Sequence, residues 1–267
     1  MKAYLTYFKL KFITGLQYRA AAYAGISTQF FFGFVFIMVY FAFYKSGSGH
    51  LPMEMSALAS YLWLNQAFFA LVTNFYKDNE IYNMIKTGNI SYELIRPKNL
   101  FYMWYFKILG QRYSNVLLRS IPIIVITLLL PKPIGLSLPV SLNAFILSIV
   151  SLFIGSLLII ALSTLYPIIT LFTMNEKGVV NIFVVIADLL SGLVVPIPFF
   201  PPFLKLISKF LPFQYVSDLP FRIYVGNISI HNGLIGLGIQ VIWLFVIILI
   251  GYNLMNYNLK RVVVQGG

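Results

Sequence analysis

PIPFFPPFLKLISKFLPFQY, residues 196–215, is apolar along most of its length but contains five prolines and two lysines. Because proline lacks a backbone N–H and interrupts helices, this segment cannot cross a bilayer as one regular helix. Irregular backbone at membrane depth is tolerated only where it is buried in protein or lines a cavity. We therefore expect short helical pieces here, one of them over residues 203–211 between the Pro201-Pro202 pair and Pro212.

The two lysines of this segment indicate which side of the membrane it occupies. Lys205 and Lys209 are four residues apart, so they share one helix face, from which they can reach the outer headgroups. Leu204, Ile207 and Leu211 are expected to point inward.

The composition of the whole chain is that of an integral membrane protein. Of its 267 residues, 60% are hydrophobic, 17% aromatic and only 10% charged, whereas soluble domains are about one quarter charged. The absence of cysteine excludes disulfides and thiol catalysis. A net charge of +12 would suit nucleic-acid binding, but the placement of the charges favours a topological role and predicts no nucleic-acid partner.

Six apolar runs are long enough to span a bilayer, which takes about 20 residues each. They cover residues 21–44, 56–75, 101–130, 142–172, 179–195 and 233–256. The second is interrupted by Asn65 and Gln66, and the third begins with a charged portion that we expect below the bilayer. Pro167 should kink or end the fourth. The fifth has 17 residues, about 25 Å at 1.5 Å per residue, which is short of a full crossing.

The basic residues predict the orientation. With six spans and both termini inside, thirteen lysines and arginines lie in inside segments and five in outside loops, the excess that cytoplasmic segments usually carry. The five outside are Lys45, Lys132, Lys205, Lys209 and Arg222. The chain is expected to be one transmembrane domain, residues 1–267, in the cell membrane of a bacterium, in contact with its lipid.

Residues 1–19 fit an amphipathic helix lying in the headgroup layer. Its apolar face is made of Tyr4, Leu5, Phe8, Phe12 and Leu16. Leu10 and Ile13 fall on the far side, where we expect them to pack on protein.

The largest inside segment, residues 76–100, contains a short amphipathic helix. Asp78 is a plausible N-cap and Gly88 a plausible residue just past the C-terminus. Glu80 and Lys86 complement the helix dipole. Ile81, Met84 and Ile85 form one apolar face. That face could enter a groove on a partner protein or lie on lipid, and the pattern alone does not choose between them.

Two stretches resemble a known family. MIKTGNISYELIRPKNL, residues 84–100, and LLSGLVVPIPFFPPFLKLISKFLPFQYVSDLPFRIYVG, residues 189–226, resemble the ABC-2 type exporter permeases in motif order and spacing. The resemblance implies a half-transporter that pairs with a second permease, the same chain or a related one. It implies a coupling helix within 76–100 that docks on an ABC ATPase, a connecting helix over 1–19, and a re-entrant hairpin over 196–216 that caps the outer end of the path.

The coupling residues expected from this resemblance are Asp78, Glu80, Ile81, Met84, Ile85, Lys86 and Gly88. The lid residues expected in the hairpin are Pro196, Pro198, Phe200, Pro201 and Pro212. No phosphate-binding G-x-x-x-x-G-K-[ST] motif is present, so ATP and magnesium belong on the partner ATPase. We expect no catalytic residue, cofactor or metal in this chain, which makes it a transport subunit rather than an enzyme.

The translocation path is expected to include Asp188, the only acidic residue within a predicted span. A carboxylate at that depth usually faces a cavity or a partner. The other interpretation, which the residues favour slightly, is a protonated or hydrogen-bonded carboxyl that locks the packing of the fifth span. Candidate aromatic lining residues are Phe30, Phe34, Phe68, Phe69 and Phe183. Such a lining would suit an amphiphilic substrate: a lipid, a drug or a peptide.

We therefore expect an all-α membrane permease of an ATP-driven exporter. A free-standing secondary transporter or channel is the alternative, but such proteins usually contain several intramembrane ionisable residues and matched broken helices. A non-pumping immunity or scaffold protein is another alternative that the sequence leaves open.

Overall fold

The computed structural model describes residues 1–47, 51–74, 77–95, 97–173 and 178–260, and within these ranges all regular structure is helical. The α-helices are α1 Lys2–Leu16, α2 Arg19–Lys45, α3 Met55–Val72, α4 Asn79–Lys86, α5 Ser91–Leu94, α6 Leu100–Leu128, α7 Leu142–Thr173, α8 Val179–Leu190, α9 Pro202–Phe210, α10 Asp218–Tyr224 and α11 Ile230–Leu259. Two 3-10 turns, η1 Ile197–Phe199 and η2 Phe213–Tyr215, flank α9.

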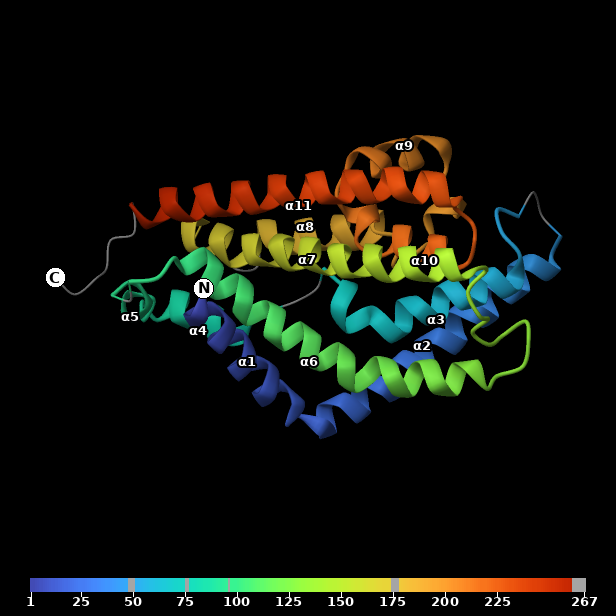
Figure 1. Cartoon of the computed structure of the whole chain (residues 1–267), viewed down its shortest axis with the longest axis horizontal. Coiled ribbons are helices and arrows are strands. Elements are labelled where there is room, and N and C mark those ends of the chain that lie inside the picture. Colours follow the sequence, from blue (N-terminus) through green and yellow to red (C-terminus); the bar gives the residue numbers. More distant parts are fainter. Residues whose placement is uncertain (48–50, 75–76, 96, 174–177, 261–267) are drawn as a thin grey trace.

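The long helices extend along the longest axis of the molecule (Figure 1). The short helices α4 and α5 lie at one end, and α9 and α10 lie toward the other. The helices α1 and α2 meet at a bend at residues 17–18. The bundle of long helices therefore connects two ends of the molecule, each with its own pair of short helices.

Among the residues that the structure describes, four helices are both long and apolar enough to cross a membrane: α2, α3, α7 and α11. The chain is accordingly a multi-pass membrane protein. The third predicted span corresponds to α6, which has 29 residues but includes Lys107, Arg112 and Arg119. The fifth corresponds to α8, which has 12 residues, about 18 Å at 1.5 Å per residue. The crossings through α6 and α8 remain predictions.

The end of the fifth predicted span and the effect of Pro167 on the fourth can both be compared with the structure. The helix α8 ends at Leu190 rather than residue 195, because the backbone reverses at Gly192, whose φ of +81° is left-handed. At the same point the Tyr61 hydroxyl and the Asp218 carboxyl come too close for a side chain. Pro167 does not end the fourth predicted span, since α7 continues through it to Thr173; the predicted kink there stays a prediction.

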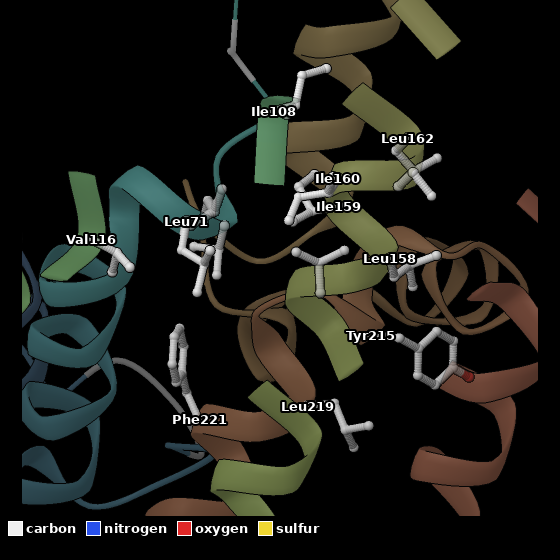
Figure 2. Packing of buried hydrophobic residues seen from close by; sticks show 14 of the residues in the cluster. Leu71, Ile108, Val116, Leu158, Ile159, Ile160, Leu162, Tyr215, Leu219 and Phe221 are labelled. Carbon is white, nitrogen blue, oxygen red and sulfur yellow. The ribbon is translucent and has the colours of Figure 1, made fainter. Parts of the chain in front are cut away.

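The core lies where α3 and the middle of α7 meet α6 and α10. Figure 2 shows Leu71 and Phe221 beside Leu158, Ile159 and neighbouring residues of this core. Without water between helices in a bilayer, such packing depends on close van der Waals fit and on small residues. Gly155 of α7 provides one close approach, since a Cβ there would lie 2.7 Å from the Val216 carbonyl oxygen. Helix α10 is thereby held against the bundle.

The amphipathic helix α1 packs along α6. The Tyr4 ring lies 5.9 Å from the ring of Phe106, and Phe8 and Phe12 are half-buried on the same side. The expectation that Leu10 and Ile13 pack on protein is wrong, because both are exposed. The reason is that α1 packs on α6 through the side that carries Tyr4, Phe8 and Phe12, which leaves Leu10 and Ile13 on the outer side.

Candidate functional site

The start of α4 is fixed by Asp78, as predicted. Its Oδ1 accepts hydrogen bonds from the backbone N–H groups of Glu80 (3.0 Å) and Ile81 (3.1 Å). These are two of the donors that a helix start leaves unsatisfied. At the other end Gly88 has a φ of +74°, the left-handed conformation predicted for the residue past the C-terminus. The loop therefore contains a short helix with both ends defined by its own sequence.

An ion cluster attaches this helix to α6 and α1. Lys107 Nζ lies 3.0 Å from Asp78 Oδ1 and 2.8 Å from Glu80 Oε2, and Lys11 Nζ lies 2.7 Å from the same Glu80 oxygen. Burial alone would raise the pKa of Glu80, but the hydrogen bonds and charges of the two lysines outweigh it and lower the pKa. The sequence predicts none of these partners for Lys107. We call Lys11, Asp78, Glu80 and Lys107 the α4 ion cluster.

The apolar face of α4 points into the chain's own core. Ile81 and Ile85 are buried, and Met84 is packed against the same cluster of apolar residues. The prediction that this face enters a partner's groove or lies on lipid is wrong for Ile81 and Ile85, because α7 and the core already cover them. Lys86 and Gly88 are exposed at the far end of the helix.

Two large apolar side chains are exposed in α5 and at the residue that follows it. Tyr92 is 68% exposed and Ile95 is 79% exposed, at the end of the molecule occupied by α4. Sequence reasoning did not single them out, although both lie in the stretch that resembles exporter permeases. Tyr76 and Arg96, also in the predicted 76–100 segment, lie outside the described residues.

Asp188 binds the chain that follows α3. Its Oδ1 accepts hydrogen bonds from the Asn74 backbone N–H (2.7 Å) and side-chain Nδ2 (3.0 Å). Arg112 donates to the carbonyl oxygens of Leu71 (2.7 Å) and Thr73 (2.9 Å). The end of α3 is thus held from α8 and from α6, by two charged side chains that are largely removed from solvent.

Asp188 also lines a cavity of about 290 Å³. The other lining residues come from α2, α3 and the turn after α8: Thr28, Gln29, Phe32, Phe36, Gln66, Phe69, Leu193 and Val194. Gln29 is 7% exposed and Gln66 is 5% exposed. Neither amide forms a hydrogen bond with the part of the chain that the structure describes. Unpaired amides in an aromatic-lined cavity are available to a ligand's polar groups. We call this the membrane cavity.

Of the residues predicted for the path, the structure brings Asp188 and Phe69 together in the membrane cavity. The others lie elsewhere. Phe30 and Phe34 pack on Trp63, with ring centroids 5.8 and 5.2 Å away, Phe68 stacks on Phe221, and Phe183 is exposed on α8. Sequence reasoning missed Gln29 as a lining residue and treated Gln66 only as an interruption of a span.

The predicted lid lies around α9, toward the end of the molecule away from α4 and α5 (Figure 1). Four of its residues are buried, Pro196, Pro198, Phe200 and Pro212, and Pro201 is exposed. The predicted helix over 203–211 is present as α9. Leu204 and Leu211 point inward as expected, packed with Phe200, but the expectation for Ile207 is wrong because it is exposed. The reason is that the inward face of α9 is completed by Ser208 instead, which is fully buried.

A buried polar network joins this end to the bundle. Asp218 of α10 pairs with Arg222 (3.2 Å) and receives a hydrogen bond from the Tyr61 hydroxyl of α3 (3.0 Å). No group of three or more His, Cys, Asp and Glu side chains suited to a metal gathers within the described ranges.

The sequence matches a protein-family model over most of its length. Residues 26–266 match the model described as "ABC-2 family transporter protein". The comparison with curated proteins returns no match. Because the family model covers nearly all of the sequence, from within α2 to beyond α11, the chain belongs to the ABC-2 transporter family.

Proposed function

We propose that this chain is the permease subunit of an ATP-driven exporter in a bacterial cell membrane. Permeases of its family are membrane transport subunits that generally work with ABC ATPase subunits and are not themselves catalytic. In this proposal the chain crosses the membrane six times with both termini in the cytoplasm. The segment over 196–216 forms a re-entrant lid, and a second permease, the same chain or a related one, completes the path.

One observation carries the proposal: the α4 ion cluster. It ties α4 to α6, a predicted spanning helix, and to α1, at the end where Tyr92 and Ile95 are exposed. If an ATPase displaced this end of the molecule, the buried ion pair between Asp78 and Lys107 would make α6 move together with α4. We therefore assign docking to the outer side of α4 and to α5, with Ile81 and Ile85 supporting the surface from beneath.

The membrane cavity supports a path for an amphiphile. It combines the Asp188 carboxylate and unpaired amides with phenylalanine rings, so one wall can bind polar groups while another contacts hydrocarbon. A lipid, an amphipathic drug or a membrane-active peptide fits that chemistry. ATP and magnesium would bind to the ATPase, since this chain lacks a phosphate-binding loop.

Docking is tested by co-purification with an ABC ATPase expressed beside the permease. Ile95→Asp and Tyr92→Asp should abolish retention of the ATPase. Leu138→Asp is a matched control, because Leu138 is as exposed as Ile95, at 79%, but lies in the α6–α7 connection at the far end of the molecule. If Ile95→Asp and Tyr92→Asp both retain the ATPase as the wild type does, the docking surface is wrong.

Orientation is tested by labelling introduced cysteines, which are informative because the chain has none of its own. In intact cells a membrane-impermeant maleimide should label Lys205→Cys and should not label Lys98→Cys. Both lysines are exposed, so accessibility differs only through topology. The reverse pattern would overturn the proposed orientation.

A further inference from the structure

A second cavity, of about 710 Å³, lies at the end of the molecule opposite α4 and α5. It is formed by α9, α10 and the first turns of α11, together with residues of η1 and η2. Its volume falls within the range of about 300 to 1,000 Å³ typical of ligand sites. It shares no lining residue with the membrane cavity, so it is a separate site.

The lining of this cavity has a net positive charge. Lys205 and Lys209 line it from α9, and Arg222 and Asp218 line it from α10. Arg222 is already paired with Asp218, whose other oxygen receives the Tyr61 hydroxyl. The ammonium groups of Lys205 and Lys209 make no ion pair or hydrogen bond with residues in the described ranges. Two uncompensated positive charges therefore border the cavity.

The first turn of α11 adds to this positive character. Ser229 caps the helix by accepting a hydrogen bond from the backbone N–H of Asn232, and both residues line the cavity. The start of this 30-residue helix carries the positive end of its dipole. The two lysines of α9 and the start of α11 therefore both favour a negatively charged ligand.

The part of the lining on α11 is apolar and adjoins exposed apolar side chains. Ile235, Gly236 and Ile239 follow one another down α11, and Ile235 is exposed beyond the cavity. The outer face of α9 is also apolar and exposed, through Phe203, Leu206, Ile207 and Phe210. A helix with this pattern lies in the headgroup layer, with its lysines at the level of lipid phosphates.

We propose that this cavity binds the phosphate headgroup of an anionic phospholipid, with the acyl chains lying along α11. Lys205 and Lys209 would contact the phosphate, and Ile235 and Ile239 would contact the first methylenes of the chains. A soluble anion would gain from the lysines but not from the apolar wall, which is why we assign a lipid. Under the topology proposed above, the lipid comes from the outer leaflet, but binding itself requires no transport.

The test is titration of the purified full-length chain in detergent, followed by native mass spectrometry. The probes are phosphatidylglycerol, phosphatidylcholine of the same chain length, and glycerol 3-phosphate. Phosphatidylglycerol should bind at least tenfold more tightly than phosphatidylcholine. Lys205→Gln/Lys209→Gln should weaken its binding roughly 25-fold, because each lysine near anionic lipid contributes on the order of a fivefold change in affinity.

The matched control is Lys45→Gln/Lys132→Gln. It removes the same charge from two exposed lysines, one at the end of α2 and one in the α6–α7 connection, that do not line the cavity, and it should leave binding unchanged. Lys205→Arg/Lys209→Arg should retain it. Equal weakening in the control pair would mean diffuse surface charge and would overturn the site. Binding of glycerol 3-phosphate as tight as that of the lipid would overturn the lipid assignment. Because no ATPase is present in the assay, failure here is distinct from failure of the proposed exporter function.

Discussion

Lys107 Nζ lies 3.0 Å from Asp78 Oδ1, and the two side chains are 0% and 3% exposed. A buried charge is stable only when it is paired and hydrogen-bonded. The same Asp78 oxygen has two roles. It accepts a hydrogen bond from the backbone at the start of α4 and another from Lys107 of α6. The positions of α4 and α6 therefore depend on each other.

Lys107→Met should destabilise the protein strongly. Removing one partner of a buried pair leaves the other uncompensated, which costs about 3–5 kcal/mol. Asparagine can still cap a helix, so Lys107→Met/Asp78→Asn should be less destabilised than Lys107→Met alone. Thermal melting in detergent, followed by tryptophan fluorescence, measures both. Lys98→Met is the control, since Lys98 is exposed; if Lys98→Met lowers the melting temperature as much as Lys107→Met, the pair is not the cause.

The contribution of Glu80 should depend on pH in one direction. Its pKa is lowered below the ordinary value of 4.5 by Lys107 and Lys11, against the opposing effect of burial. A lowered pKa stabilises the folded state above pH 4.5, and this stabilisation is lost as the pH falls through the folded-state pKa. The difference in melting temperature between wild type and Glu80→Gln should stay constant from pH 7 to 5 and shrink below 4.5. A difference that persists unchanged at pH 3 would exclude the ion pairs as its source.

The caps of α4 could be predicted because they are local: Asp78 binds residues two and three positions on, and Gly88 needs only its own backbone freedom. The ion cluster could not. Lys107 is 29 residues from Asp78, and the Leu71 carbonyl that binds Arg112 is 41 residues away. A periodic pattern shows which face is apolar but does not name the neighbour that covers it.

The same limit explains the membrane cavity. Gln29 and Gln66 each look like a polar residue interrupting an apolar run, and their shared environment exists only because α2 packs on α3. Phe30 and Phe34, one helix turn apart on α2, were as plausible for the path as Phe32 and Phe36. Phe30 and Phe34 pack against the ring of Trp63 on α3. Phe32 and Phe36 line the membrane cavity instead.

Asp188→Ala should cost about 1–3 kcal/mol, because it leaves the buried Asn74 backbone N–H without its acceptor. Asp188→Asn keeps an oxygen in place and should cost less. Melting temperature separates these two, and uptake of a fluorescent amphiphile into inverted vesicles containing the ATPase reports on transport. Loss of uptake in a well-folded Asp188→Asn variant would assign a role to the charge itself. Uptake equal to wild type at every pH would make Asp188 purely structural.

Gln66→Leu and Gln29→Leu should leave the melting temperature unchanged or raise it, and should reduce amphiphile uptake. Each amide lines the membrane cavity without a hydrogen bond to the described chain, so an apolar side chain of similar size removes no protein hydrogen bond and adds apolar surface to the cavity wall. Gln240→Leu is the contrasting control. Its Nε2 donates to the carbonyl oxygens of Ser151 (2.7 Å) and Tyr215 (2.6 Å), so its loss should destabilise by roughly 2–3 kcal/mol. If Gln66→Leu and Gln29→Leu lower the melting temperature as much as Gln240→Leu does, these amides stabilise the fold. The assignment of the membrane cavity as a substrate site would then be wrong.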